Sequence, residues 1–313
     1  MAHRAQPVLA TTDVFVKGDI HWKQFSTDTS TSSSSPPKPL RIFTPTLPGA
    51  YPVILFCHGF CLRSIYYSKL LGHIVSHGFI LVAPQLFSNG MPVFEADEMK
   101  WAGKVVDWLA EGLQALLPEN VKAKLEKVVL SGHSKGGKTA FAVALGYAKT
   151  NLKFSALVSI DPVAGISKFC RTHPRILTGE PRSFNLNIPV AVIGTGLGPE
   201  KVNFLYPPCA PDGENYKEFF SECKPPCANF VATKYGHMDV LDDETPGVLG
   251  TILSKCMCKN GPGPRDLIRR TVGGLVVAFL RAQLNDQWKD FDAILADPNL
   301  APTDLSDVVY LSA

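Results

Sequence analysis

At residues 128–140 the chain reads Val-Val-Leu-Ser-Gly-His-Ser-Lys-Gly-Gly-Lys-Thr-Ala. The stretch begins as an apolar, β-branched run and ends in small residues that suit the start of a helix. The pattern predicts a strand over residues 125–131 and a helix over residues 136–148. Between them, residues 132–136 form a complete G-x-S-x-G, so a serine stands in the turn that joins a strand to a helix.

A G-x-S-x-G in this strand–turn–helix context is typical of the nucleophile elbow of α/β-hydrolases. Glycines flank the serine because the turn is too tight for side chains, and the turn presents the Ser134 hydroxyl. The helix that follows directs its N-terminal N–H groups to the place where negative charge develops. We therefore expect an α/β-hydrolase fold, with a mostly parallel central sheet and helices on both faces, as one domain over residues 1–313. The alternative is a serine in an ordinary Gly-rich turn of an α/β protein.

Composition limits the class of protein. The 313 residues are 45% hydrophobic, which is enough to build the core of a large α/β domain. A formal net charge of +3 is small for this length and predicts no nucleic-acid partner. No apolar run is long enough to span a membrane, and residues 1–10 lack the order of a secretory signal. We expect a soluble intracellular protein; the short leader leaves plastid import open as well as the cytosol.

The cysteines leave two arrangements open. The chain has eight cysteines, a density below that of disulfide-framework proteins. They form no C-x-x-C, and no histidine completes a zinc pattern, so we expect no metal site. Either all are free thiols, or one or two disulfides form among a subset of five. That subset is Cys209, Cys223, Cys227, Cys256 and Cys258.

Other apolar runs predict the remaining elements. Strands are expected at residues 13–20 and 41–43 as sheet edges, and at 51–57, 79–83, 154–160, 188–193 and 229–233, the last being the final strand. Helices are expected at residues 67–75, 101–116 and 270–284. Residues 26–39 are rich in Ser and Pro and predict a mobile surface loop, residues 203–227 an insertion, and residues from about 288 a loosely patterned tail.

The loop after the strand at 51–57 reads His58-Gly59-Phe60. In α/β-hydrolases the corresponding loop supplies one N–H of the oxyanion hole. We take the Phe60 N–H as that donor and the Lys135 N–H, directly after the serine, as the second. His58 is a conceivable base, but a histidine in a His-Gly turn usually braces its loop, which is the interpretation we favour.

Asp161 directly follows the strand at 154–160 and is our candidate for the acid that orients the base. A carboxylate at this end of a parallel strand lies on the edge where such sheets bind ligands. Many α/β-hydrolases carry their acid one strand later. Here the strand at 188–193 is followed by Thr195 and glycines instead, which favours Asp161.

His237 stands in a Gly-containing loop after the strand at 229–233, where the general base of this fold belongs. The order Ser134, Asp161, His237 is the order in which the fold carries its triad. Ser134 would attack an ester carbonyl, His237 would take its proton, and Asp161 would hold the imidazole. No metal or cofactor is required. Three aspartates rival Asp161, but they follow the histidine, where capping or solvation explains them: Asp239, Asp242 and Asp243.

Taken together, these motifs resemble the plant chlorophyllases along nearly the whole chain. The matching stretches are residues 53–59, 73–84, 132–137, 161–165, 193–198 and 235–239. The resemblance implies hydrolysis of chlorophyll to chlorophyllide and phytol in a chloroplast, with the family's Ser, Asp and His at Ser134, Asp161 and His237. The family elbow often has arginine where this chain has Lys135. The backbone N–H that the mechanism needs is unaffected, but any side-chain contact of that arginine is in question.

Apolar loops near the serine suggest an oily substrate. The loops at 85–94 and 197–211 are candidate walls of a cleft for chlorophyll, an amphiphile that would also suit peripheral contact with a membrane. We expect substrate contacts from Phe87, Met91, Phe94 and Leu197. The first loop could instead pack on the next helix. Two other functions stay open: a broader carboxylesterase or lipase, and a ligand binder that has lost turnover on a hydrolase fold.

Overall fold

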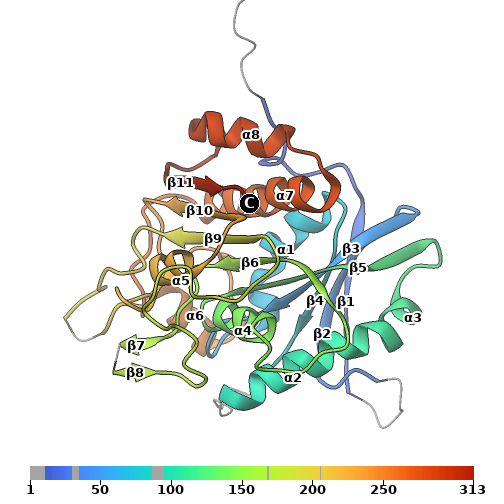
Figure 1. Cartoon of the computed structure of the whole chain (residues 1–313), viewed down its shortest axis with the longest axis horizontal. Helices are drawn as coiled ribbons and strands as arrows, with labels where there is room; N and C mark the ends of the chain where they lie inside the picture. The colour runs from blue at the N-terminus through green and yellow to red at the C-terminus, as the bar shows by residue number, and fades with distance from the viewer. Residues whose placement is uncertain (1–10, 30–34, 87–94, 168, 205) are drawn as a thin grey trace, which may run out of the picture.

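The computed structural model describes residues 11–29, 35–86, 95–167, 169–204 and 206–313. In these residues a nine-stranded sheet has the order β1-β2-β4-β3-β5-β6-β9-β10-β11 (Figure 1). Its strands are β1 Trp22–Thr27, β2 Leu40–Pro45, β3 Gly49–Cys57, β4 Ile80–Pro84, β5 Val121–His133, β6 Phe154–Ile160, β9 Val190–Thr195, β10 Cys227–Ala232 and β11 Leu305–Leu311.

The central strands run in parallel. β4, β3, β5, β6, β9 and β10 pair in this way, whereas β1, β2 and β11 add antiparallel edges. Parallel neighbours need long crossover connections, usually helices, and these connections cover both faces of the sheet. The predicted fold class, a mostly parallel sheet with helices on both faces, is confirmed.

Each face of the sheet carries its own hydrophobic core. Side chains alternate along a strand, so Ile54 and Phe56 of β3 pack on one face and Val53 and Leu55 on the other. Figure 1 shows α7 and α8 on one side of the sheet and α2 and α4 on the other. The first face is covered by α1 Ser68–Val75, α7 Arg265–Asn285 and α8 Lys289–Ala296, and the second by α2 Glu95–Trp108, α4 Lys135–Ala144 and α5 Tyr216–Glu222.

The carboxyl ends of the parallel strands meet at one edge, on the left in Figure 1. The short hairpin of β7 (Gly165–Ser167) and β8 (Cys170–Arg171) and the helix α6 (Val248–Lys255) also lie toward this side. Parallel sheets bind their ligands at the carboxyl edge, because the loops that leave the strands there are free to build a site. We call this side the catalytic edge below.

The N-terminal segment differs from the prediction. Residues 13–20 form turns and bends rather than an edge strand. Val14 and Phe15 are buried, and they lie so close to Gly274 of α7 that a Cβ there would stand 2.4 Å from the Phe15 ring. Val14 and Phe15, apolar residues of the predicted strand, therefore pack on a helix instead of pairing in the sheet. The edge strand is β1, which includes the first two residues of the predicted loop at 26–39.

The C-terminal segment is more regular than the predicted tail. After Trp288 the chain forms α8 and then β11, which pairs with β10, so the strand predicted at 229–233 is not the final one. The apolar side chains of β11 that pack on the two cores do so only partly, which explains the weak sequence pattern: Leu305, Val308, Tyr310 and Leu311. The predicted insertion at 203–227 likewise contains a helix, α5.

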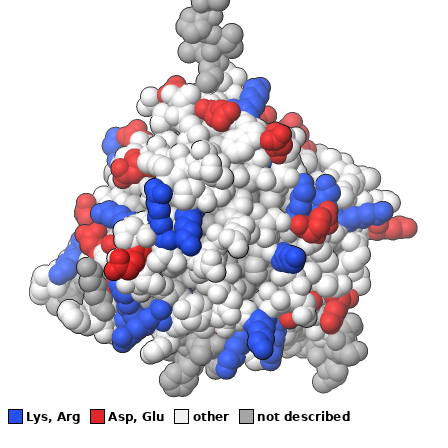
Figure 2. Space-filling view, viewed as in Figure 1, with Lys and Arg blue, Asp and Glu red and all other residues white. Residues whose placement is uncertain are grey.

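The helix predicted at residues 101–116 is divided into three helical segments. These are α2, a π-helical turn at Leu109–Leu113 and the short α3, Gln114–Leu116. No helix within the described ranges combines the length and the apolar character needed to cross a bilayer. On the face drawn in Figure 2, basic and acidic side chains are interspersed among uncharged residues, so charge alone marks no binding surface there.

Candidate active site

The predicted elbow joins β5 to α4 and holds Ser134 in an unusual backbone conformation. Ser134 has φ 58° and ψ −127°, values that non-glycine residues rarely adopt. A Cβ at Gly132 would lie 2.3 Å from the carbonyl oxygen of Gly136, and one at Gly136 would lie 2.1 Å from that of Cys57. Both positions therefore need glycine, as expected for a turn that packs its backbone this closely.

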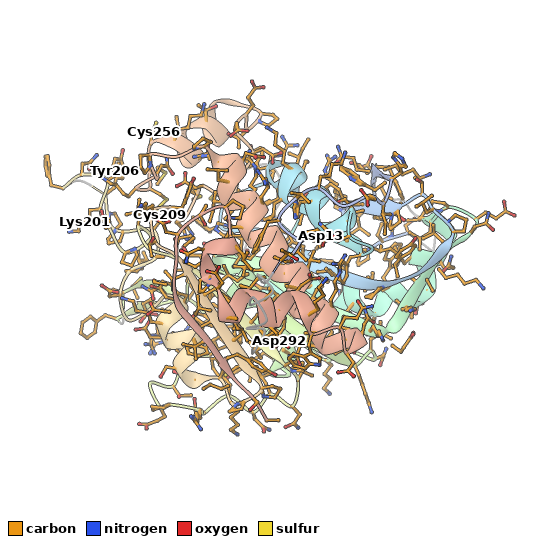
Figure 3. All side chains as sticks on the ribbon, turned by 90° about the horizontal axis from the view of Figure 1, so that it is seen from above. Asp13, Lys201, Tyr206, Cys209, Cys256 and Asp292 are labelled. Atoms are coloured by element: carbon orange, nitrogen blue, oxygen red, sulfur yellow. A yellow bond between two sulfur atoms is a disulfide. The ribbon has the colours of Figure 1, made fainter. Side chains whose placement is uncertain are left out.

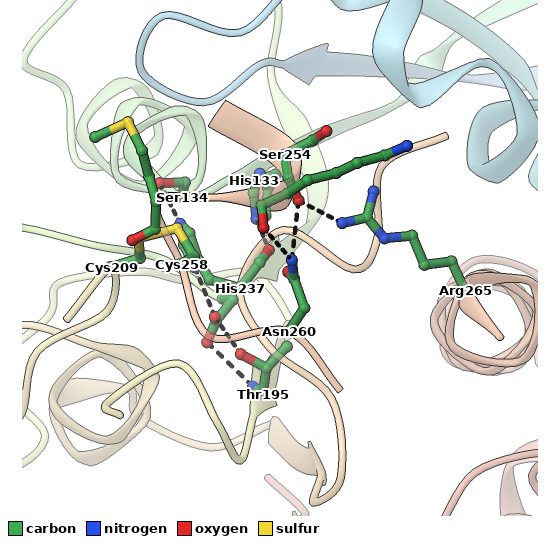
Figure 4. Close-up of a disulfide and its surroundings, with 12 residues drawn as sticks. His133, Ser134, Thr195, Cys209, His237, Ser254, Cys258, Asn260 and Arg265 are labelled. Carbon is green, nitrogen blue, oxygen red and sulfur yellow. Dashed lines mark hydrogen bonds and ion pairs between the residues drawn. A yellow bond between two sulfur atoms is a disulfide. The ribbon is translucent and has the colours of Figure 1, made fainter. Parts of the chain in front are cut away.

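Three side chains from separate parts of the sequence meet in one hydrogen-bonded line at the catalytic edge. His237 Nε2 lies 2.8 Å from Ser134 Oγ, and His237 Nδ1 lies 2.7 Å from Asp161 Oδ2 (Figure 4). Ser134, Asp161 and His237 are 7%, 0% and 1% exposed. A carboxylate at Nδ1 favours the tautomer with its proton there, so Nε2 can accept the serine proton. The arrangement can generate a serine nucleophile away from bulk water.

Thr195 holds Asp161 in this line. The Thr195 N–H donates to Asp161 Oδ1 at 3.1 Å, and the Thr195 hydroxyl donates to Oδ2 at 2.5 Å. Asp161 itself has φ 41°, so its backbone also leaves the common regions. In the sequence, Thr195 was notable only because it stands where many α/β-hydrolases carry the acid. The parallel pairing of β6 with β9 places Ile160 opposite Ile193, so the residues that follow both positions are neighbours in the folded protein.

The three rival aspartates contact groups other than His237, although capping or solvation does not explain the buried Asp239. Asp239 Oδ2 accepts the N–H of Gly236 at 2.7 Å and of Gly261 at 2.6 Å, so it ties two loops together. Asp242 accepts a backbone N–H at the start of α1. Asp243 forms ion pairs with basic side chains of α1 and α7, which hold its pKa at about 2 against the opposing effect of burial.

Comparison with known proteins identifies the family. A family model described as Chlorophyllase matches residues 10–312. The chain is 53% identical over 276 residues to Chlorophyllase-1 of Arabidopsis thaliana, covering 87% of this chain and 84% of the relative. The chain belongs to the chlorophyllase family. It is also 52% identical over 262 residues to Chlorophyllase-2 of the same plant, covering 82% and 81%. To "Chlorophyllase-1, chloroplastic" of Citrus unshiu it is 48% identical over 311 residues, covering 98% and 92%. The resemblance inferred from the motifs is confirmed.

In this chlorophyllase-family chain the loop after β3 passes directly beside Ser134. A Cβ at Gly59 would lie 3.1 Å from Ser134 Cβ. Phe60 follows in this loop, and Lys135 is the first residue of α4. The Lys135 ammonium lies 5.2 Å from the centre of the Phe60 ring, so the two residues are near each other. These positions suit the two oxyanion donors, whose role stays a prediction.

Lys135 occupies the elbow position at which the chlorophyllase family often has arginine. Lys135 is 8% exposed, and its Nζ lies 3.0 Å from Oε1 of Glu98, a buried residue of α2. The lysine therefore has a buried ionic partner in addition to its contact with the Phe60 ring. This pair ties the start of α4 to α2, a contact that the sequence did not reveal.

His58 holds the loop after β3 in place, which is the interpretation favoured from the sequence. Its Nδ1–H donates to the Gly59 carbonyl at 2.9 Å, and its Nε2 accepts the Leu86 N–H at 3.0 Å. Burial lowers the pKa of His58 to about 4. The ring is therefore neutral near neutral pH and fixed by its neighbours on both sides.

Of the expected substrate contacts, only Leu197 can be placed. It is half-buried in the loop after β9, and its N–H donates to the Tyr235 carbonyl at 3.0 Å. At the next residue, Gly198, a Cβ would lie 3.0 Å from Asp161 Oδ2, so this loop runs against the site. Phe87, Met91 and Phe94 lie outside the described residues.

A disulfide between Cys209 and Cys258 joins the loop after β9 to the segment after α6. Figure 4 shows it beside Ser134 and His237, and Figure 3 places Cys209, Tyr206 and Cys256 toward the same end of the molecule. Of the other cysteines in the candidate subset, Cys223, Cys227 and Cys256 are free. Of the two arrangements that the sequence left open, the structure has the one with a disulfide rather than the one in which all cysteines are free. Among the described residues, no group of three His, Cys, Asp or Glu is placed to hold a metal ion.

Proposed function

We propose that this protein is a serine carboxylic-ester hydrolase that cleaves the phytyl ester of chlorophyll to chlorophyllide and phytol. The observation that carries the proposal is the unbroken hydrogen-bonded line from Ser134 through His237 to Asp161. Membership in the chlorophyllase family supports the choice of chlorophyll as the substrate. The relative from Citrus unshiu that is named chloroplastic supports action in the chloroplast.

The reaction follows from the groups in the line. Ser134 Oγ attacks the ester carbonyl carbon while His237 Nε2 takes the hydroxyl proton, and Asp161 stabilises the imidazolium that forms. The N–H groups of Phe60 and Lys135 bind the oxyanion of the tetrahedral intermediate. His237 then gives the proton to the phytol oxygen as the ester C–O bond breaks. Water, deprotonated by His237, attacks the acyl-enzyme and releases chlorophyllide.

The substrate side of the proposal rests on apolar contacts. Phytol is a long branched hydrocarbon alcohol and the chlorin ring is flat and largely apolar, so both gain from burial at the catalytic edge. We assign Leu197, Phe87, Met91 and Phe94 to this contact. A substrate of this kind resides in lipid, so the protein would work in peripheral contact with a membrane.

The test is incubation of the purified protein with chlorophyll a, followed by phase separation of the products. Release of a green product that has lost phytol, absent with Ser134→Ala, supports the proposal. A short p-nitrophenyl ester is assayed in parallel. Fast turnover of the short ester with none of chlorophyll would instead favour a general esterase. Failure of a fluorophosphonate to label Ser134 would favour a binding protein without turnover.

A further inference from the structure

A second buried chain of hydrogen bonds connects two loops of the site. The first is the loop at residues 58–60, which we call the oxyanion loop, and the second is the loop that carries His237. The Gly59 N–H donates to the Tyr67 hydroxyl oxygen at 3.1 Å. The Tyr67 hydroxyl lies 2.9 Å from His133 Nδ1, and His133 Nε2 lies 2.9 Å from the carbonyl oxygen of His237. The chain therefore begins next to Phe60 and ends on the backbone of the residue that serves as base in the proposed reaction.

The direction of every bond in this chain is fixed by chemistry. The His237 carbonyl can only accept, so His133 Nε2 carries the proton. A neutral imidazole has one N–H, which leaves His133 Nδ1 as an acceptor. The Tyr67 hydroxyl must then donate to Nδ1, and its oxygen is left to accept the Gly59 N–H. Burial lowers the pKa of His133 and raises that of Tyr67, so both side chains stay neutral at working pH.

The side chains of Tyr67 and His133 are buried, so water does not compete for their hydrogen bonds. Tyr67 and His133 are each 0% exposed. The Tyr67 ring packs edge-on against Phe56 of β3, at 4.9 Å between ring centres, and the His133 ring lies 4.6 Å from that of His237. Rigid neighbours hold both rings, so the hydroxyl acts at a fixed point between the two loops.

We propose that Tyr67 is a positioning residue that fixes the oxyanion loop relative to the base. Its hydroxyl oxygen accepts the Gly59 N–H and so orients the peptide unit before the one that carries the Phe60 N–H. His133 accepts the Tyr67 hydroxyl proton and donates to the His237 carbonyl, which links this position to His237. This inference rests on the proposed function, because it concerns the geometry of that reaction. A donor that acts on the transition state must be held at a fixed distance from the oxyanion.

The chain offers a matched pair of variants. Tyr67→Phe removes only the hydroxyl and keeps the ring. Tyr66→Phe makes the same change at the neighbouring residue, which is 4% exposed and donates to the Pro246 carbonyl at 2.9 Å. Each variant removes one tyrosine hydroxyl, which makes two hydrogen bonds in Tyr67 and one in Tyr66. A purely structural role predicts that any loss of activity follows the loss of stability in each variant.

If the proposal is right, Tyr67→Phe lowers kcat on a short p-nitrophenyl ester by about 10- to 100-fold with KM little changed. The rate of Ser134 labelling by a fluorophosphonate, whose adduct also occupies the oxyanion hole, falls in parallel. Tyr66→Phe retains kcat within about twofold. Equal kcat losses in the two variants, or a loss confined to KM, would overturn the proposal.

Amide hydrogen exchange provides a readout that does not depend on turnover. We expect Tyr67→Phe to speed exchange in peptides covering residues 58–62 and 235–239, and Tyr66→Phe to leave both unchanged. Unchanged exchange at both loops in Tyr67→Phe refutes the coupling even if the wild-type protein proves inert to every ester. Turnover of the short ester without turnover of chlorophyll refutes only the proposed substrate, since the comparison of kcat values stands.

Discussion

At the scale of single residues, the reactivity of Ser134 depends on where neighbouring atoms place it. Gly132 and Gly136 let the backbone fold tightly enough to hold the serine at positive φ. In the proposed reaction, His237 accepts the serine proton from 2.8 Å, and Asp161 orients the imidazole from 2.7 Å. Each member of the line contributes through the next, so removing any one of them is expected to cost most of the rate.

Ser134→Ala is expected to reduce ester hydrolysis by at least about 10⁴-fold, because Ser134 supplies the hydroxyl that lies at His237 Nε2. The fold should remain, since alanine is smaller than serine and introduces no new contact. Initial rates on chlorophyll a and on a short ester measure the loss, and circular dichroism checks the fold. Residual activity above about 1% of wild type would remove Ser134 from the mechanism.

Asp161→Asn and Asp239→Asn separate the two candidate acids. Asp161→Asn should lower kcat on the order of 10⁴-fold, because an amide that donates to Nδ1 leaves the imidazole in the wrong tautomer. Asp239→Asn should cost far less activity, because Asp239 binds loop N–H groups and the Arg265 side chain rather than His237. The reverse order of the two effects would assign the acid to Asp239.

At the scale of elements, the carboxyl ends of β5, β6 and β9 bring Ser134, Asp161 and Thr195 together, and the loop after β10 adds His237. The parallel pairing of these strands sets the relative height of the residues that follow them. The antiparallel strand β11 closes the sheet beyond β10 and shields its edge.

Removal of β11 should therefore destabilise the protein. Deleting residues 305–313 exposes the edge of β10 and removes four partly buried apolar side chains: Leu305, Val308, Tyr310 and Leu311. We expect the free energy of unfolding to fall by roughly 2–4 kcal/mol, for four side chains whose partial burial is lost. Urea unfolding followed by circular dichroism measures the change. The control deletes only the exposed Ser312 and Ala313, and an equal effect of both truncations would contradict the structural role of β11.

At the scale of the whole molecule, several histidines are buried in their neutral form. Burial lowers the pKa of His58 and of His73 to about 4, and also lowers the pKa values of His77 and His133. In the unfolded chain a histidine has a pKa near 6.5. Between pH 6.5 and about 4 the unfolded chain therefore binds more protons than the folded protein, so acidification favours unfolding.

The free energy of unfolding should consequently fall between pH 7 and pH 5, a window in which few carboxylates titrate. The expected loss is on the order of 2 kcal/mol for each of His58 and His73. Urea midpoints at the two pH values measure it, and His73→Gln should reduce the difference by the share of one histidine. A midpoint that does not change with pH would show that these side chains are not buried as the structure has them.

Sequence patterns were sufficient to predict the elbow, the parallel centre of the sheet and the meeting of Ser134, Asp161 and His237 in one site. These features depend on local signals: apolar runs, glycines in a tight turn, and residues placed directly after strands. The site could be assembled from them because parallel strands end at a common edge, so residues far apart in the chain must meet there.

The groups that support this site could be identified only in the folded protein. Nothing local in the sequence indicates that Thr195 holds Asp161, that Lys135 pairs with Glu98, or that Tyr67 bridges Gly59 and His133. The same applies to β11 and to the disulfide between Cys209 and Cys258. Each of these contacts joins segments that meet only in the folded protein, and the sequence pattern around one residue does not show which partner it will contact. Their partners are selected by the distances and burial that the folded chain creates, and these exist only after the elements have packed.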